Sequence, residues 1–153
     1  MTQEEMGEEE LPLGALLRIP YTALIGALER EMRVAGYLDV RSAHFSVLQP
    51  LMFRPEGMRT TDLAAWAKIS KPSIVYLVDH LEAAGYVERT ADPTDGRAQQ
   101  VRLTTRGWDM TRVADTSAHQ VEGEWEDRIG TTQIGQLKQI LRDLIASFQR
   151  DPL

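Results

Sequence analysis

The sequence predicts a mainly α fold with one small β-hairpin, and three observations lead to this expectation. Apolar residues recur every three or four positions in long stretches near both ends of the 153-residue chain. Between them, a short helix-forming stretch opens with a serine cap and follows a tight turn. Directly after it, the hydrophobic period changes from about 3.6 to about 2 around a turn rich in Pro, Asp and Gly. Two short helices and a hairpin are therefore expected between long helices.

The first long helix is expected within residues 11–36, as an N-terminal dimerisation helix. Pro20 interrupts its apolar stripe, so the helix either kinks there or begins there. A second helix is expected from about Arg41 to Phe53, before a turn marked by a proline and a glycine. The stripe of the first helix comprises Leu13, Leu16, Leu17, Tyr21, Leu24, Leu28 and Met32.

Two short helices joined by a tight turn come next. The first is expected at about Thr61 to Ala67, with Thr60 or Thr61 as its N-cap. The second opens at the N-cap Ser70, has Pro72 in its first turn and runs to about Ala84. Two helices joined this closely, the second capped by serine, are typical of a helix-turn-helix. The apolar stripe of the second helix is Ile74, Leu77, Val78 and Leu81.

The period-2 stretch predicts a β-hairpin. Tyr86–Thr90 and Gln99–Leu103 are the expected strands, and Asp92–Arg97 is the expected turn. A hairpin directly after a helix-turn-helix is a wing. Residues 37–107 are therefore expected to form a winged helix-turn-helix.

Residues 108–153 are expected to form two C-terminal dimerisation helices. Thr104 or Thr105 caps the first of them, and the second carries the cleanest apolar stripe of the sequence. With the N-terminal helix, they hold more apolar surface than a small three-helix module can cover, so a partner subunit is expected to bury it. The last stripe comprises Ile134, Leu137, Ile140, Leu141, Leu144, Ile145 and Phe148.

The composition excludes several classes of protein. Because the chain has no cysteine, it forms no disulfide, thiolate metal site or cysteine-based peroxide sensor. No apolar run approaches the roughly 18–20 residues of a membrane span. Residues 1–10 hold five glutamates and lack the basic and apolar regions of a secretory signal. We expect a cytoplasmic protein with an acidic disordered tail at residues 1–10.

The charge permits nucleic-acid binding without arguing for it. The formal net charge is −6, but the centre of the chain, from Arg59 to Arg106, has seven basic and six acidic residues. The centre is thus nearly neutral between acidic flanks. Contacts with phosphate would depend on where each base lies rather than on bulk charge.

The residues of the wing resemble those of one known family. Asp95-Gly96-Arg97, followed by Leu103-Thr104-Thr105-Arg106-Gly107, resembles the Asp-x-Arg…Leu-Thr-x-x-Gly wing signature of MarR-type (multiple antibiotic resistance) transcriptional regulators. Residues 69–89 are similar to the family's recognition helix and its exit, and Asp62-Leu63-Ala64 matches the start of the supporting helix. The resemblance implies a homodimer with interlocked terminal helices, in which each subunit presents a winged helix to one half of a DNA site.

Candidate DNA contacts lie on the wing and on the recognition helix. The Arg97 guanidinium suits a narrow minor groove, and the resemblance implies that contact, with Asp95 orienting the arginine. The alternative is a solvated Asp–Arg surface pair. The first turn of the recognition helix offers N–H groups, hydroxyls and a lysine to phosphate, although Ser70 also serves as an ordinary cap. The helix residues concerned are Ser70, Lys71, Pro72, Ser73, Val75, Tyr76 and His80.

Val75, Tyr76 and His80 are the candidates for the major groove. For His80 a solvated histidine on the helix face is the alternative. Arg is common in the family at the positions of Tyr76 and His80, so the positive charge of this helix is reduced here. The base preference is therefore expected to differ from the family's usual one.

The expected function is that of a sequence-specific transcriptional regulator, a repressor that binds a pseudo-palindromic operator as a homodimer. A small aromatic or phenolic effector is expected to release it, from a pocket that Arg41, His44 and Trp66 would flank. The alternative is a winged-helix dimer that acts as a protein-interaction module with little or no DNA binding. No motif indicates an enzyme, a cofactor or a metal site. The Asp92/Asp95 pair could chelate a divalent cation, but turn chemistry explains it more simply. All three tryptophans are nevertheless expected to be core or dimer anchors: Trp66, Trp108 and Trp125.

Overall fold

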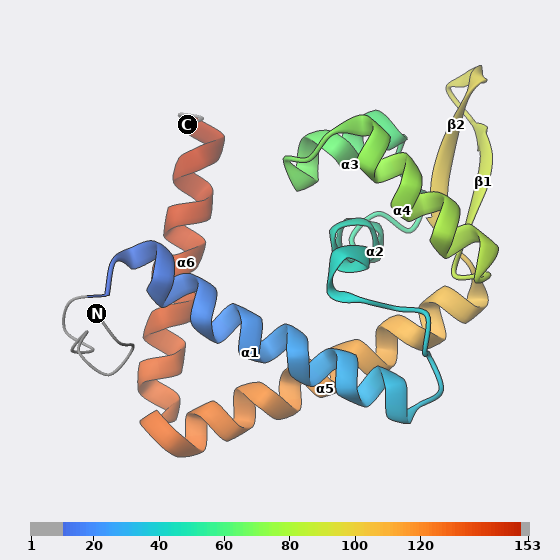
Figure 1. Cartoon of the computed structure of the whole chain (residues 1–153). Coiled ribbons are helices and arrows are strands. Elements are labelled where there is room, and N and C mark those ends of the chain that lie inside the picture. Colours follow the sequence, from blue (N-terminus) through green and yellow to red (C-terminus); the bar gives the residue numbers. More distant parts are fainter. Residues whose placement is uncertain (1–10, 151–153) are drawn as a thin grey trace, which may run out of the picture. The chain divides into compact units, whose positions relative to one another are not determined.

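The computed structural model describes residues 11–150, which form a mainly helical fold with one antiparallel hairpin (Figure 1). This confirms the predicted fold class. The chain divides into two compact units, Met1–Ser117 and Ala118–Leu153. None of the helices described is long and apolar enough to cross a membrane. The elements are α1 (Leu13–Val34), the 3-10 helix η2 (Ser42–His44), α2 (Phe45–Met52), α3 (Thr60–Ala67), α4 (Lys71–Ala83), β1 (Val87–Asp92), β2 (Asp95–Leu103), α5 (Thr105–Ile129) and α6 (Thr131–Arg150).

The core of the first unit is apolar and is contributed by the α-helices from α1 to α5 and by both strands. The predicted stripe of α4 is buried at Ile74, Val78 and Leu81, while Leu77 is half-buried. Burying aliphatic side chains of this size contributes about 1.5–3 kcal/mol each, which is what holds the short helices together. Fully buried large side chains of this unit include Met32, Val40, Val47, Leu48, Leu51, Leu63, Ile74, Val78, Leu81, Tyr86, Val87, Val101 and Met110.

Of the two forms predicted for the first helix, the structure shows the longer one. It begins at Leu13 and contains Pro20, so it does not begin at the proline. Leu28 and Met32 are buried, whereas the N-terminal part of the same apolar stripe is exposed. The acidic tail expected at residues 1–10 lies outside the described residues.

Two of the predicted helix starts are wrong. The helix expected from Arg41 begins instead with the 3-10 turn η2, and α2 starts at Phe45. Helix α3 starts one residue earlier than expected, so that its N-cap is Arg59, which makes no side-chain capping hydrogen bond. A threonine at the start of this helix is therefore inside it and not its cap.

The hairpin has longer strands and a tighter turn than predicted. β1 and β2 pair from Val87↔Leu103 to Asp92↔Asp95, which leaves only Pro93 and Thr94 between the strands. An irregularity between Ala91 and Asp92 shifts the register near the tip. Arg97 consequently lies in β2 and not in the turn itself.

The hairpin has a further backbone partner that the sequence pattern does not indicate. Met58, just before α3, forms an antiparallel bridge with Val101 of β2. The Met58 N–H donates to the Val101 carbonyl at 2.9 Å, and the Val101 N–H donates to the Met58 carbonyl at 2.8 Å. This bridge ties the segment before the helix-turn-helix to the base of the wing.

The predicted cap of α5 is confirmed at Thr104. Its hydroxyl accepts a hydrogen bond from the Gly107 N–H at 3.0 Å and donates one to the Gly85 carbonyl at 2.6 Å. Within the second unit, Gly130 has a φ of 102° and separates α5 from α6, where a break was expected. Trp108 and Trp125 are half-buried on α5, whereas Trp66 on α3 is 48% exposed and is no core residue in this chain.

Candidate nucleic-acid interface

The first turn of α4 has the geometry of a capped, open helix end. Ser70 is the N-cap, its Oγ accepts from the Ser73 N–H at 3.3 Å, and the two hydroxyls lie 2.8 Å apart. Lys71 and Pro72 are exposed beside them. The positive end of the helix dipole, two hydroxyls and one ammonium thus share this turn, an arrangement suited to a phosphate group.

Further along α4, the candidate base contacts differ in how they are held. The Tyr76 side chain is 72% exposed, and Val75 next to it is half-buried. His80 is exposed, but its ring stacks on that of His44, with centroids 4.8 Å apart and planes 13° apart. His80 Nε2 also lies 3.1 Å from the Asp39 carbonyl oxygen. Tyr76 is therefore the open side chain of this face, whereas His80 is tied to the segment between α1 and η2.

The turn of the wing is built around a buried carboxylate. Asp92 is 8% exposed, and its Oδ1 accepts hydrogen bonds from the Thr94 N–H at 2.8 Å and from the Thr94 hydroxyl at 2.7 Å. Its Oδ2 accepts from Arg59 Nε at 2.6 Å. The hydrogen bonds from Thr94 and Arg59 hold the pKa of the Asp92 carboxyl well below its usual range. Asp92 therefore closes the turn as an anion, and its oxygens are taken up by this turn chemistry.

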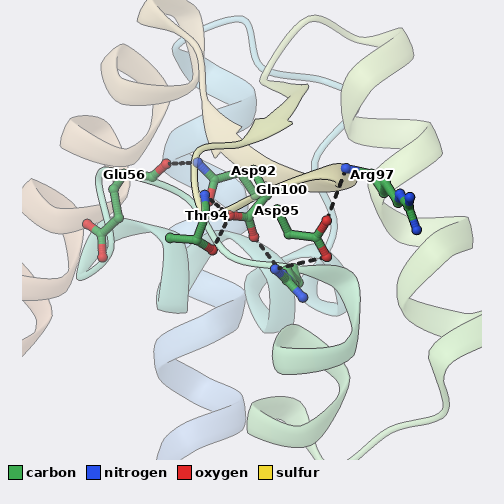
Figure 2. Close-up of polar contacts among 7 residues, drawn as sticks. Glu56, Asp92, Thr94, Asp95, Arg97 and Gln100 are labelled. Atoms are coloured by element: carbon green, nitrogen blue, oxygen red, sulfur yellow. Dashed lines mark hydrogen bonds and ion pairs between the residues drawn. The ribbon is translucent and has the colours of Figure 1, made fainter.

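Arg97 points away from this cluster (Figure 2). Its backbone N–H donates to Asp95 Oδ1 at 3.1 Å, while its side chain is exposed. Within residues 11–148, the Arg97 guanidinium has neither a hydrogen-bond nor an ion-pair partner. Asp95 thus holds the backbone of Arg97 and not its guanidinium, which is left open to solvent.

The wing and α4 are joined by an ion-pair cluster that sequence reasoning missed. Arg89 of β1 contacts Asp79 Oδ1 through Nη2 at 2.5 Å, and it pairs with Glu82 through Nη1. The Arg89 N–H also donates to Glu82 Oε1 at 3.2 Å. Because Asp79 and Glu82 lie on α4, this arginine fixes the hairpin against the helix. The i, i+3 spacing of Asp79 and Glu82 places both acids on one face of the helix. It does not indicate that their partner is an arginine on a strand.

The described part of the chain contains no cluster of three or more His, Asp or Glu side chains that could hold a metal ion. Of the three residues expected to flank an effector pocket, His44 is buried, and its Nδ1 accepts from the Arg41 N–H at 2.9 Å. Trp66 is exposed on α3.

The first turn of α4 and the open arginine of the wing together offer positively charged groups to a polyanion. The succession of α3, α4 and the hairpin of β1 and β2, with this surface on it, defines the chain as a winged helix-turn-helix protein.

Known proteins agree with this class. A model described as the MarR family matches residues 38–98 of the chain. A MarR-family transcriptional regulator from Rhodococcus sp. RHA1 is 27% identical, with 86% of this chain and 92% of that chain covered and a TM-score of 0.69. CouR from Rhodococcus jostii RHA1, solved bound to p-coumaroyl-CoA, is 28% identical, with coverages of 86% and 90% and a TM-score of 0.68. The chain is thus similar to MarR-family transcriptional regulators, and the family's model covers its helix-turn-helix and most of its wing.

A third relative is described as a repressor. The transcriptional repressor MprA of Escherichia coli (strain K12) is 24% identical over 94 residues, which are 61% of this chain and 53% of that protein. The chain therefore spans about half the length of this relative. MprA and the Rhodococcus sp. RHA1 protein are described as transcriptional regulators, and neither is described as an enzyme.

Proposed function

We propose that this chain is a MarR-type regulator, a repressor that binds a pseudo-palindromic DNA operator as a homodimer and is released by a small-molecule effector. The observation that carries the proposal is the pairing of two elements within one unit. The capped first turn of α4 faces solvent with Lys71, and the wing carries an arginine whose guanidinium has no partner in the described chain. Nine residues are proposed to form the DNA interface, with Asp95 supporting Arg97: Ser70, Lys71, Pro72, Ser73, Val75, Tyr76, His80, Asp95 and Arg97.

The two elements correspond to two kinds of DNA contact. The first turn of α4 would hold phosphate, and Tyr76 would reach a base edge of the major groove. Arg97 would enter the adjacent minor groove, where a weakly hydrated guanidinium is favoured. In a two-fold dimer the two copies of α4 would lie about 34–36 Å apart, one turn of DNA, so the operator would be a pseudo-palindrome.

The proposed effector is inferred by analogy with CouR. CouR was solved with an aromatic acyl-coenzyme A, which supports an aromatic or phenolic ligand for this chain. Such a ligand would act by favouring dimers whose recognition helices no longer match the spacing of the half-sites.

The function is tested by selecting bound duplexes from a random library and then titrating the selected duplex across salt concentrations. We expect a pseudo-palindromic sequence, with the logarithm of the binding constant falling steeply against the logarithm of salt concentration. If no sequence is enriched, DNA recognition by this surface is wrong, and the protein-interaction module becomes the better account. In that case a pull-down with the full chain is the next experiment.

Arg97→Ala is expected to weaken binding to the selected duplex about 10- to 100-fold and to reduce the salt slope by about one. The melting temperature should stay unchanged, because the guanidinium has no partner within the described chain. Arg102→Ala on the same strand is the matched control, since Arg102 is paired with Glu88 at 2.7 Å near the base of the hairpin. Equal losses in the two variants would contradict a specific contact by Arg97.

A further inference from the structure

The turn of the wing depends on a side chain from outside the wing. Arg59 is the N-cap residue of α3, and 33 positions separate it from Asp92 in the sequence. Its Nε donates to Asp92 Oδ2 at 2.6 Å, and its Nη2 lies 3.9 Å from Asp95 Oδ2. One guanidinium therefore spans the residues on both sides of the Pro93–Thr94 turn.

These contacts form a continuous chain that ends at the proposed DNA contact. Arg59 holds Asp92 and approaches Asp95, and Asp95 in turn accepts a hydrogen bond from the Arg97 N–H (Figure 2). Asp92 is buried and also binds both donors of Thr94. If the arginine were absent, Asp92 would keep only the contacts within the turn, and Asp95 would have no contact with α3.

The segment before α3, residues 54–59, also contacts the wing at two positions closer to the base of the hairpin. The Gln100 Nε2 donates to the Glu56 carbonyl at 2.8 Å, and Met58 is bridged to Val101. The first contact uses the side chain of Gln100 and the second the backbone of Val101, and both lie nearer the base of β2 than its tip. Arg59 is the member of this segment that reaches the tip of the hairpin.

We propose that Arg59 is a positioning residue for the wing, which acts through Asp92 and Asp95 to fix where Arg97 is presented to DNA. Its own guanidinium is engaged with these carboxylates and makes no contact with DNA. A forked guanidinium is required, because a single ammonium cannot reach both carboxylates in this geometry. The inference rests on the proposed function for its DNA-binding readout, and on the hydrogen bonds of the turn for its readout without DNA.

A double-mutant cycle on duplex affinity separates positioning from direct contact. Arg59→Gln is expected to weaken binding about 3- to 10-fold, less than Arg97→Ala. In the Arg97→Ala background, Arg59→Gln should cause no further loss, because the residue through which it acts is missing. Losses that multiply in the double variant would show that Arg59 contacts DNA itself and would overturn the inference.

Two single variants control for charge. Arg59→Lys keeps the positive charge but not the fork, so it should behave like Arg59→Gln. Arg54→Gln removes a charge from the same segment, where Arg54 lies 3.9 Å from Glu56 and contacts no wing residue through an ion pair. It should leave affinity within about twofold of the wild type. Full rescue by lysine, or an equal loss at Arg54, would mean that only local charge matters and would overturn the proposal.

A readout without DNA keeps the inference distinct from the proposed function. In Arg59→Gln and Arg59→Lys, hydrogen exchange at the Thr94 and Arg97 amides should be about tenfold faster or more than in the wild type, while amides of α4 stay protected. If the wild type binds no duplex but this exchange changes as expected, the proposed function fails and the positioning of the wing by Arg59 stands. Unchanged exchange at both amides would refute the inference whatever the DNA result.

Discussion

Among single residues, the polar groups of the wing divide into those that build it and those left for a partner. Asp92 is buried and accepts three hydrogen bonds, so both of its carboxylate oxygens are occupied within the fold. Because the pKa of this carboxyl is held below its usual range, it remains an acceptor throughout the physiological pH range. Arg97, five residues later, has an open guanidinium. A charged side chain that the fold does not use is the stronger candidate for recognition.

His44 is a buried group whose protonation state matters for stability. It is 6% exposed, and its Nδ1 accepts the Arg41 N–H, which only the unprotonated nitrogen can do. Burial, followed by the nearby His80 and Arg41, lowers the pKa of His44, while Glu29 raises it by a smaller amount. Because His80 belongs to α4, protonating His44 weakens the stack between this segment and the recognition helix.

The sign of the pH dependence follows from this lowered pKa. The unfolded state binds a proton at His44 below about pH 6.5, while the folded state resists it until the pH is lower. Stability from His44 is therefore fully present above about pH 6.5 and is lost as the pH falls towards the folded pKa. His44→Asn keeps an acceptor near the position of Nδ1 but does not titrate. Its melting temperature should fall less between about pH 7.5 and pH 5.5 than that of the wild type, as measured by circular dichroism. Equal falls would show that His44 is not the group responsible.

At the scale of elements, the junction between α4, the wing and α5 depends on a close approach of backbones. Gly107, in the first turn of α5, is buried, and a Cβ built on it would lie 2.1 Å from the Tyr86 carbonyl oxygen. That carbonyl accepts the Thr104 N–H at 3.1 Å, so it cannot move without losing the start of α5. The glycine of the Leu-Thr-x-x-Gly signature thus has a packing reason in this chain.

Gly107→Ala is expected to lower the free energy of unfolding by about 1–3 kcal/mol, because the added methyl forces the α5 backbone away from Tyr86. Gly123→Ala on the same helix is the matched control. Its Cβ would meet nothing within 4 Å, so alanine should raise the free energy of unfolding by about 0.5–1 kcal/mol. Both are measured by urea denaturation. A stabilising effect at both positions would mean that the approach of α5 to Tyr86 is not tight.

Elements could be predicted from the sequence where their signals are local. The Ser70 cap and the stripe of α4 follow from neighbouring residues, and the helix ends at Ala83, within one residue of the expected end. Most of the positions that were missed depend on partners distant in the chain. The Met58 bridge, the contact of Arg59 with the wing and the stack between His44 and His80 leave no periodic trace in the sequence. The tight turn at Pro93–Thr94 was also missed, because a Pro-, Asp- and Gly-rich stretch fixes the place of a turn better than its length.

For the molecule as a whole, the distribution of exposed apolar side chains is the feature that the single chain leaves unexplained. On α1, Leu13 is 66% exposed and Tyr21 is 55% exposed, and on α6 Ile140 is 64% exposed. Isolated apolar side chains on a surface are ordinary, but these repeat at helical spacing along both helices. The exposed members on α6 are Leu137, Ile140, Leu144, Ile145 and Phe148. A second copy of the chain covering these rows is the arrangement that we propose for the homodimer.

Leu144→Glu tests the proposed dimer, because a carboxylate in the middle of the α6 row would have to be buried without a partner in the interface. We expect the wild type to elute as a dimer of about 35 kDa by light scattering, twice the 17.3 kDa chain, and the variant to dissociate at least 100-fold more readily. Ala146→Glu is the control, since residue 146 is exposed and lies on the opposite side of the same helix. It adds the same charge and should remain dimeric. A monomeric wild type, or equal dissociation of both variants, would refute the use of this row as the interface. Operator affinity should fall in parallel with dimerisation in Leu144→Glu alone, because a monomer presents one winged helix to a two-part site.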